Sequence, residues 1–136
     1  MQHFNSKNKG KALVVGGSLS GLMTAIALAE EDIEVILLEK TAEGSREGVG
    51  LQVDGSRFYQ SKTEKRLRQL ASGGKATVEL WSSIEARLRN AAHKEPNIHL
   101  LFNQRVVEVG QSTESAWAET SEGERFHSDL LIGADG

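Results

Sequence analysis

The sequence contains no cysteine and has no excess of positive charge. The absence of cysteine excludes a disulfide framework and any metal site built from thiolates. The four histidines are scattered and do not show the spacing of metal ligands. The formal net charge of −3 disfavours nucleic acid as a partner, because phosphate binding requires clustered lysine and arginine in excess. We therefore expect a small-molecule partner and a reducing, cytoplasmic location.

The chain also lacks a run that meets the criteria for a membrane span. Residues 12–29 carry no charge and follow three lysines, which superficially resembles a signal peptide. Three glycines, two serines and a threonine dilute the hydropathy, and an apolar, strand-like run follows directly. No membrane association is expected. Residues 1–10 are polar and aperiodic, so we expect a flexible leader before a single domain at 11–136.

The hydrophobic pattern predicts alternating strands and helices. The apolar run Ala12–Val15 is closed by two glycines, which is typical of a strand buried on both faces. A helix is expected from Ser20 to Glu31, and a second buried strand from Ile33 to Glu39. The remaining pattern predicts helices at 56–70 and 81–93, and short strands at 51–53, 99–102, 106–109, 116–120, 125–127 and 130–132.

This order of elements predicts the fold class. The strands from residue 99 onward are separated by turn signals, and we interpret them as an antiparallel meander that leads into a last buried strand. The expected fold is α/β: a Rossmann-like domain with a parallel sheet, helices on both faces and a small antiparallel β-meander.

A glycine-rich turn between the first strand and the first helix carries the strongest functional signal. Gly16 and Gly21 occupy the first and last positions of the G-x-G-x-x-G fingerprint, and Ser18 replaces the middle glycine. Gly16 permits a tight turn, and Gly21 permits close packing of the helix on the strand. The helix N-terminus then presents free N–H groups to a pyrophosphate. Gly17 and Ser20, which complete the turn, belong to the same predicted cofactor-binding set.

An acidic residue supports this interpretation. Glu39 ends the second predicted strand near the expected offset from the turn, where a carboxylate accepts hydrogen bonds from the ribose of an adenosine. Lys40 follows it and is included in the predicted site. The alternative is a generic βαβ turn without a ligand. Since FAD and NAD both use such a turn, the fingerprint alone does not choose between them.

Three separated segments resemble the class A flavoprotein aromatic monooxygenases related to para-hydroxybenzoate and salicylate hydroxylases. They are the run from GGSLSGL to VILLEK, the stretch Arg46-Glu47-Gly48-Val49-Gly50-Leu51, and the terminal DLLIGADG, which is similar to the family's DG motif after its strand. The likeness covers nearly all of residues 11–136. It implies that FAD is the cofactor and that NAD(P)H is the electron donor.

The resemblance also implies roles for individual residues. Gly16, Ser18 and Gly21 would face the pyrophosphate of FAD, and Glu39 its adenosine ribose. Arg46 would approach the phosphates or the ribityl chain, the backbone of Val106 would meet the adenine, and Asp135 would support the far side of the cofactor. The helix from Trp81 would help to hold the flavin. For Arg46 the alternative is an exposed loop cation, and for Asp135 a charged chain end.

The resemblance implies that the substrate-binding sheet and the later GD motif of the family lie beyond Gly136. We therefore expect FAD binding as the N-terminal part of an aromatic monooxygenase, without hydroxylation by this chain alone and without catalytic residues of its own. Two alternatives remain open: an NAD-binding Rossmann module, or a non-catalytic interaction remnant whose last strand pairs with another copy or a complementing chain.

Overall fold

The computed structural model describes residues 9–43, 50–52, 61–72 and 78–135. Four parallel strands form the central sheet in the order β5-β2-β1-β9. Their bounds are Lys11–Val15 (β1), Glu34–Leu38 (β2), Ile98–Leu101 (β5) and Leu130–Gly133 (β9). Because β1 pairs with β2 on one side and β9 on the other, the strand order reverses direction beside β1, which makes this a switch point in the topology.

Three helices and two small antiparallel sheets complete the described fold. The helices are α1 (Leu19–Glu30), α2 (Lys62–Ser72) and α3 (Trp81–His93). The short strands β3 (Gly50–Gln52) and β4 (Val78–Leu80) pair with each other. The strands β6 (Val106–Gln111), β7 (Ala116–Thr120) and β8 (Arg125–Ser128) form the meander. No helix within these described ranges is long and apolar enough to cross a bilayer.

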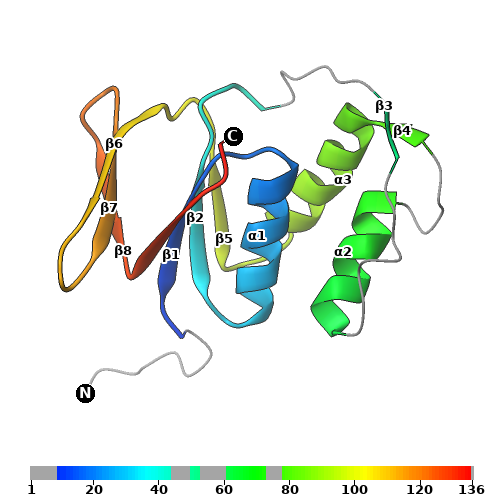
Figure 1. The fold of residues 1–136 in the computed structure, drawn as a ribbon, viewed down its shortest axis with the longest axis horizontal. Helices are drawn as coiled ribbons and strands as arrows, with labels where there is room; N and C mark the ends of the chain where they lie inside the picture. Colours follow the sequence, from blue (N-terminus) through cyan, green and yellow to red (C-terminus); the bar gives the residue numbers. More distant parts are fainter. Residues whose placement is uncertain (1–8, 44–49, 53–60, 73–77, 136) are drawn as a thin grey trace.

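The two faces of the parallel sheet are covered differently (Figure 1). The three described helices lie on one face, and the meander lies on the other. The parallel sheet and the meander agree with the expected fold class, but the expectation of helices on both faces does not hold for the described residues. The meander takes that place because Ala118 and Phe126 pack against Leu13 and Leu38 of the sheet.

Most of the core lies between the sheet and the helices. Leu22 and Ile26 of α1 and Ile84 and Leu88 of α3 are fully buried in one cluster with residues of β1, β2 and β5. The helical spacing of these apolar residues is what brings them onto one face of each helix. The predicted helix at 81–93 agrees with α3, and α1 begins and ends one residue before the predicted 20–31.

The predicted assignment of the strand at 99–102 was wrong. It was placed in the meander, whereas β5 pairs in parallel with β2 at the edge of the main sheet. The connection through α3 explains the difference, because a helix between two strands supplies the crossover that parallel pairing requires.

The last strand also differs from its prediction. We expected β9 to be buried, but in the described structure it is an edge strand and Leu130 is 39% exposed. The strand β4 was not predicted, and residues 53 and 56–60 of the predicted elements lie outside the described residues.

An arginine holds α2 against the two other helices. Arg66 forms ion pairs with Glu30 of α1 and with Glu95 after α3. Burial alone would lower the pKa of Arg66, but the hydrogen bonds and charges of Glu95 and Glu30 outweigh it and raise that pKa. The guanidinium is therefore charged throughout the ordinary pH range.

Candidate functional site

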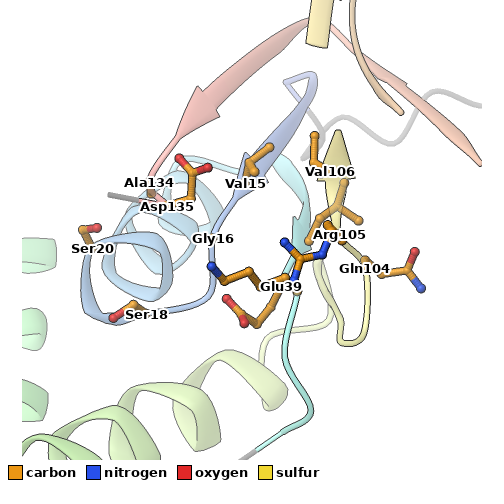
Figure 2. Close-up of a pocket in the computed structure, with 12 residues that line it drawn as sticks. Val15, Gly16, Ser18, Ser20, Glu39, Gln104, Arg105, Val106, Ala134 and Asp135 are labelled. Carbon is orange, nitrogen blue, oxygen red and sulfur yellow. The ribbon is translucent and has the colours of Figure 1, made fainter. Parts of the chain in front are cut away.

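A pocket opens at the carboxyl ends of the parallel strands, beside the switch point (Figure 2). Its volume is about 380 Å³. In α/β sheets this is the position where ligands characteristically bind. The lining residues are Val15, Gly16, Ser18, Ser20, Leu38, Glu39, Lys40, Gln104, Arg105, Val106, Ala134 and Asp135.

The turn after β1 is shaped by two glycines that tolerate no side chain. Gly16 has a φ of 110°, and a Cβ there would lie 2.6 Å from the carbonyl oxygen of Ala134. A Cβ on Gly21 would lie only 1.7 Å from the carbonyl oxygen of Gly16. Both neighbours are backbone atoms, so they cannot move aside as a flexible side chain would. These are the steric roles that the sequence predicts for Gly16 and Gly21.

The N-terminus of α1 borders the pocket. Ser18 is the N-cap residue, with φ −82° and ψ −165°, yet its side chain makes no capping hydrogen bond. Ser18 and Ser20 both line the cavity, and the first turn of α1 contains no acidic residue. The partial positive charge at the start of a helix therefore lies beside the pocket without a carboxylate of that turn to neutralise it. This arrangement suits an anionic group.

Glu39 is a buried carboxylate fixed against the turn. It is 4% exposed, and its Oε1 accepts a hydrogen bond from the N–H of Gly17 at 2.9 Å. Its Oε2 accepts from the N–H of Thr41 at 2.7 Å and from the Thr41 hydroxyl at 2.5 Å. These bonds offset the cost of removing a carboxylate from water. A Cβ on Gly17 would lie 2.9 Å from the Cβ of Glu39, so Gly17 provides the space for this acid.

The opposite wall comes from the segment that joins β5 to β6. The N–H of Gln104 donates to the carbonyl oxygen of Glu39 at 2.8 Å, and the N–H of Ser121 donates to the carbonyl oxygen of Arg105 at 2.8 Å. These two bonds hold the segment between the end of β2 and the meander. Val106 was predicted to belong to the site, whereas Gln104 and Arg105 were not. Polar residues in a connection, one half-buried and one exposed here, give no local signal, and only their position directly before Val106 pointed to them.

The residues after β9 close the pocket beside the glycine turn. The N–H of Ala134 donates to the carbonyl oxygen of Val15 at 2.7 Å, which brings the end of the chain against β1. A Cβ on Gly16 would lie 2.8 Å from the Cα of Asp135. Figure 2 shows Asp135 near the start of α1, at the other end of the pocket from Gln104.

Most of the predicted residues therefore meet at one cavity. Ten residues were predicted. The lining includes Gly16, Ser18, Ser20, Glu39, Lys40, Val106 and Asp135, while Gly17 and Gly21 shape the turn behind it. Arg46 lies outside the described residues. Whether these residues bind a cofactor stays a prediction.

Comparisons with known proteins find a hydroxylase and FAD-dependent monooxygenases among the relatives. No protein-family model matches the chain. The 3-hydroxybenzoate 6-hydroxylase of Klebsiella oxytoca is 25% identical, and the match covers 93% of this chain and 40% of the hydroxylase. The FAD-dependent monooxygenase ausM of Emericella nidulans is 29% identical, and the match covers 93% of this chain and 32% of the relative.

A solved structure shows a similar fold. The crystal structure of CtdE in complex with FAD and a substrate superimposes with a TM-score of 0.76 at 20% identity. That match covers 94% of this chain and 38% of CtdE. The chain thus spans only about a third to two fifths of the proteins it matches. From these relatives we conclude that the chain is a homologue of part of the FAD-dependent monooxygenases.

Proposed function

We propose that this chain binds FAD, with the adenosine diphosphate half of the cofactor in the pocket at the ends of β1 and β2. One observation carries the proposal: the glycine turn, the N-terminus of α1 and the buried Glu39 border the same cavity at the switch point of the sheet. A dinucleotide requires these three elements together, for its pyrophosphate and its ribose.

The turn fits the pyrophosphate. Backbone atoms of Ala134 and Gly16 lie where a Cβ would stand on Gly16 and Gly21, so these two glycines keep the turn tight against its neighbours beside the start of α1. The N–H groups at the start of α1 and the hydroxyl of Ser18 supply hydrogen-bond donors. In the proposed complex these groups hold the anionic centre of the cofactor.

The other end of the pocket fits the adenosine. Glu39 would accept hydrogen bonds from the ribose hydroxyls, and its negative charge disfavours an adenosine with a 2′-phosphate. The backbone of Val106 would meet the adenine. Lys40 and Asp135 would flank the cofactor at the two ends of the cavity. The hydrogen bonds to Gly17 and Thr41 would keep the carboxylate in place before the ligand arrives.

FAD is preferred over NAD because the relatives include FAD-dependent monooxygenases. When bound, FAD would supply the redox and oxygen chemistry, and the protein would supply binding and orientation. For the full-length protein we propose a monooxygenase that uses NAD(P)H and acts on aromatic compounds. The part proposed for the present chain is cofactor binding.

Binding is tested with the purified chain. We expect FAD to bind stoichiometrically, seen as flavin absorbance that stays with the protein after gel filtration, and ADP to compete with it in calorimetry. NADH fluorescence provides the opposing test, since tight NADH binding without FAD binding would favour the NAD module. Failure of FAD and ADP alike to bind or to raise the melting temperature would refute the proposal.

Substitution of Glu39 tests the site itself. Glu39→Gln removes a charged acceptor, and we expect ADP affinity to fall by about 10- to 150-fold, since a hydrogen bond to a charged group contributes about 1.5–3 kcal/mol. Glu34→Gln is the matched control, because Glu34 begins β2, the strand that Glu39 follows, at the end remote from the pocket. Circular dichroism of both variants separates lost binding from lost folding. Equal affinities of the two variants would contradict a ribose role for Glu39.

A further inference from the structure

The pocket has an unusual wall where a base would lie. The residues that line it in the described part of the chain include no aromatic side chain. The largest planar group among them is the guanidinium of Arg105, a residue without a role in the proposal above. Nucleotide bases bind well against flat surfaces, and aromatic rings commonly provide them. Where the described lining lacks such a ring, another flat group can take its place against the base.

The position of Arg105 suits the base end of the site. The pyrophosphate is assigned to the start of α1 and the ribose to Glu39, so the base falls beyond Glu39. The bond from the Gln104 N–H to the Glu39 carbonyl oxygen, 2.8 Å long, places Arg105 at that end. Figure 2 shows the Arg105 side chain extending from the 104–106 segment toward the side of the pocket where Glu39 lies.

The guanidinium of Arg105 is available for a ligand. The Arg105 side chain is exposed, and it makes no ion pair or hydrogen bond with the residues that the structure describes. The nearby Glu39 carboxylate receives hydrogen bonds from Gly17 and Thr41. Only the backbone of Arg105 is held, through its carbonyl oxygen, by the N–H of Ser121. The backbone of Arg105 is thus fixed, while its guanidinium remains available in the cavity.

We propose that Arg105 is the base platform of this site: its guanidinium lies against the face of the adenine and makes the pocket selective for purine nucleotides. The inference rests on the proposed function, because it assumes that the pocket takes an adenosine diphosphate group. Arginine stacks on aromatic faces through a planar, delocalised cation, whereas lysine offers only a point charge. This difference makes stacking distinguishable from simple charge attraction.

The test compares Arg105→Ala, Arg105→Lys and Arg125→Ala by calorimetric titration with ADP and with UDP, at low and at high salt. Arg125→Ala removes the same charge from the meander, outside the pocket. We expect Arg105→Ala to weaken ADP binding by about 5- to 30-fold, in line with the contribution of a desolvated cation–π contact. Arg105→Lys should lose nearly as much, and the loss should persist at high salt.

The ratio of the ADP and UDP affinities distinguishes stacking from charge attraction, because loss of a contact that depends on charge alone would leave this ratio unchanged. The wild type should prefer ADP over UDP, because the purine offers the larger face, and Arg105→Ala should reduce that preference. An Arg105→Ala affinity within twofold of the wild type would overturn the inference. So would full retention of affinity in Arg105→Lys, or an equal loss for both nucleotides that salt removes. If the wild type binds neither nucleotide nor FAD, the proposed function itself fails.

Discussion

The two faces of the parallel sheet differ in how many apolar side chains they bury. Among the residues that the structure describes, twelve buried ones form one continuous cluster on the helical face, whereas the cluster on the meander face contains three, Leu13, Leu38 and Ala118. Val107 and Val109 of β6 are more than half exposed. Since burial of apolar surface is the main source of folding free energy, the helical face carries most of the stability.

One wall of the pocket comes from the helical face of the sheet, and the opposite wall comes from the meander face. The glycine turn and the start of α1 belong to the helical face, while the 104–106 segment leads into the meander. Ligand binding is therefore separable from stability on the meander side of the pocket. Substitutions on the helical face should unfold the domain, and those at the start of the meander should change binding with little cost in stability.

The largest effect is expected at the joint between α1 and β1. In Gly21→Ala the added Cβ meets the Gly16 carbonyl oxygen at 1.7 Å, so the helix must move away from the turn. We expect destabilisation of more than about 3 kcal/mol, the upper end of the usual range for overpacking, and complete loss of ADP binding. Urea denaturation followed by circular dichroism measures the first effect, and calorimetry the second.

Gly110→Ala is the matched control on the meander. Its Cβ would lie 2.2 Å from the ring of Trp117, but that neighbour is a half-buried side chain that can turn aside. A loss as large as that of Gly21→Ala would show that the meander is as tightly constrained as the turn.

The second prediction compares the two faces directly. Leu88 is fully buried among the helices, and Leu88→Ala should lower the free energy of unfolding by about 3 kcal/mol through lost burial and a cavity. Phe126 packs on the other face and is half-buried, so Phe126→Ala should cost less, about 1–2 kcal/mol, despite removal of a larger side chain. The reverse order in denaturant titrations would refute the division of stability.

The same division explains how much of the fold was predictable from sequence. The helix at Trp81–His93 was predicted with the correct bounds because its apolar stripe is a local property of the chain. The pairing of β5 with β2 was missed, since a short apolar run such as Ile98–Leu101 carries no local mark of its partner. Glu39 was predicted because it follows the glycine turn at a fixed offset.

By contrast, no local pattern marks Arg105, whose position depends on the pairing of β5 with β2. That pairing brings the following segment to the end of β2, where the Gln104 N–H reaches the Glu39 carbonyl oxygen. Residue patterns alone thus predicted the part of the site that one βαβ unit builds, whereas Val106 and Asp135 were predicted only through the family resemblance and Arg105 was missed.

The third prediction concerns the ion pairs that hold α2. Arg66→Ala should destabilise the domain by about 1 kcal/mol, because the charges are partly exposed and screened by solvent. The pKa of Arg66 is raised above its ordinary value, so the stability it contributes is present below that value and is lost only at still higher pH. The effect of Arg66→Ala should therefore not change through deprotonation of arginine near neutral pH, but it should shrink with salt. A salt-independent loss in denaturant titrations would indicate packing of the side-chain stem instead.

The smallest effect is expected on the outer surface of the meander. The guanidinium of Arg125 lies 4.0 Å from the centre of the Trp117 ring and 3.0 Å from a carboxylate oxygen of Glu119. Arg125→Ala should cost about 0.5–1 kcal/mol, the value of an exposed cation–π contact, and leave ADP affinity unchanged. Denaturant titration and calorimetry measure the two quantities. If ADP binding weakened with Arg125→Ala, the meander and the pocket would be coupled, and the separation of binding from stability argued above would fail on this face of the sheet.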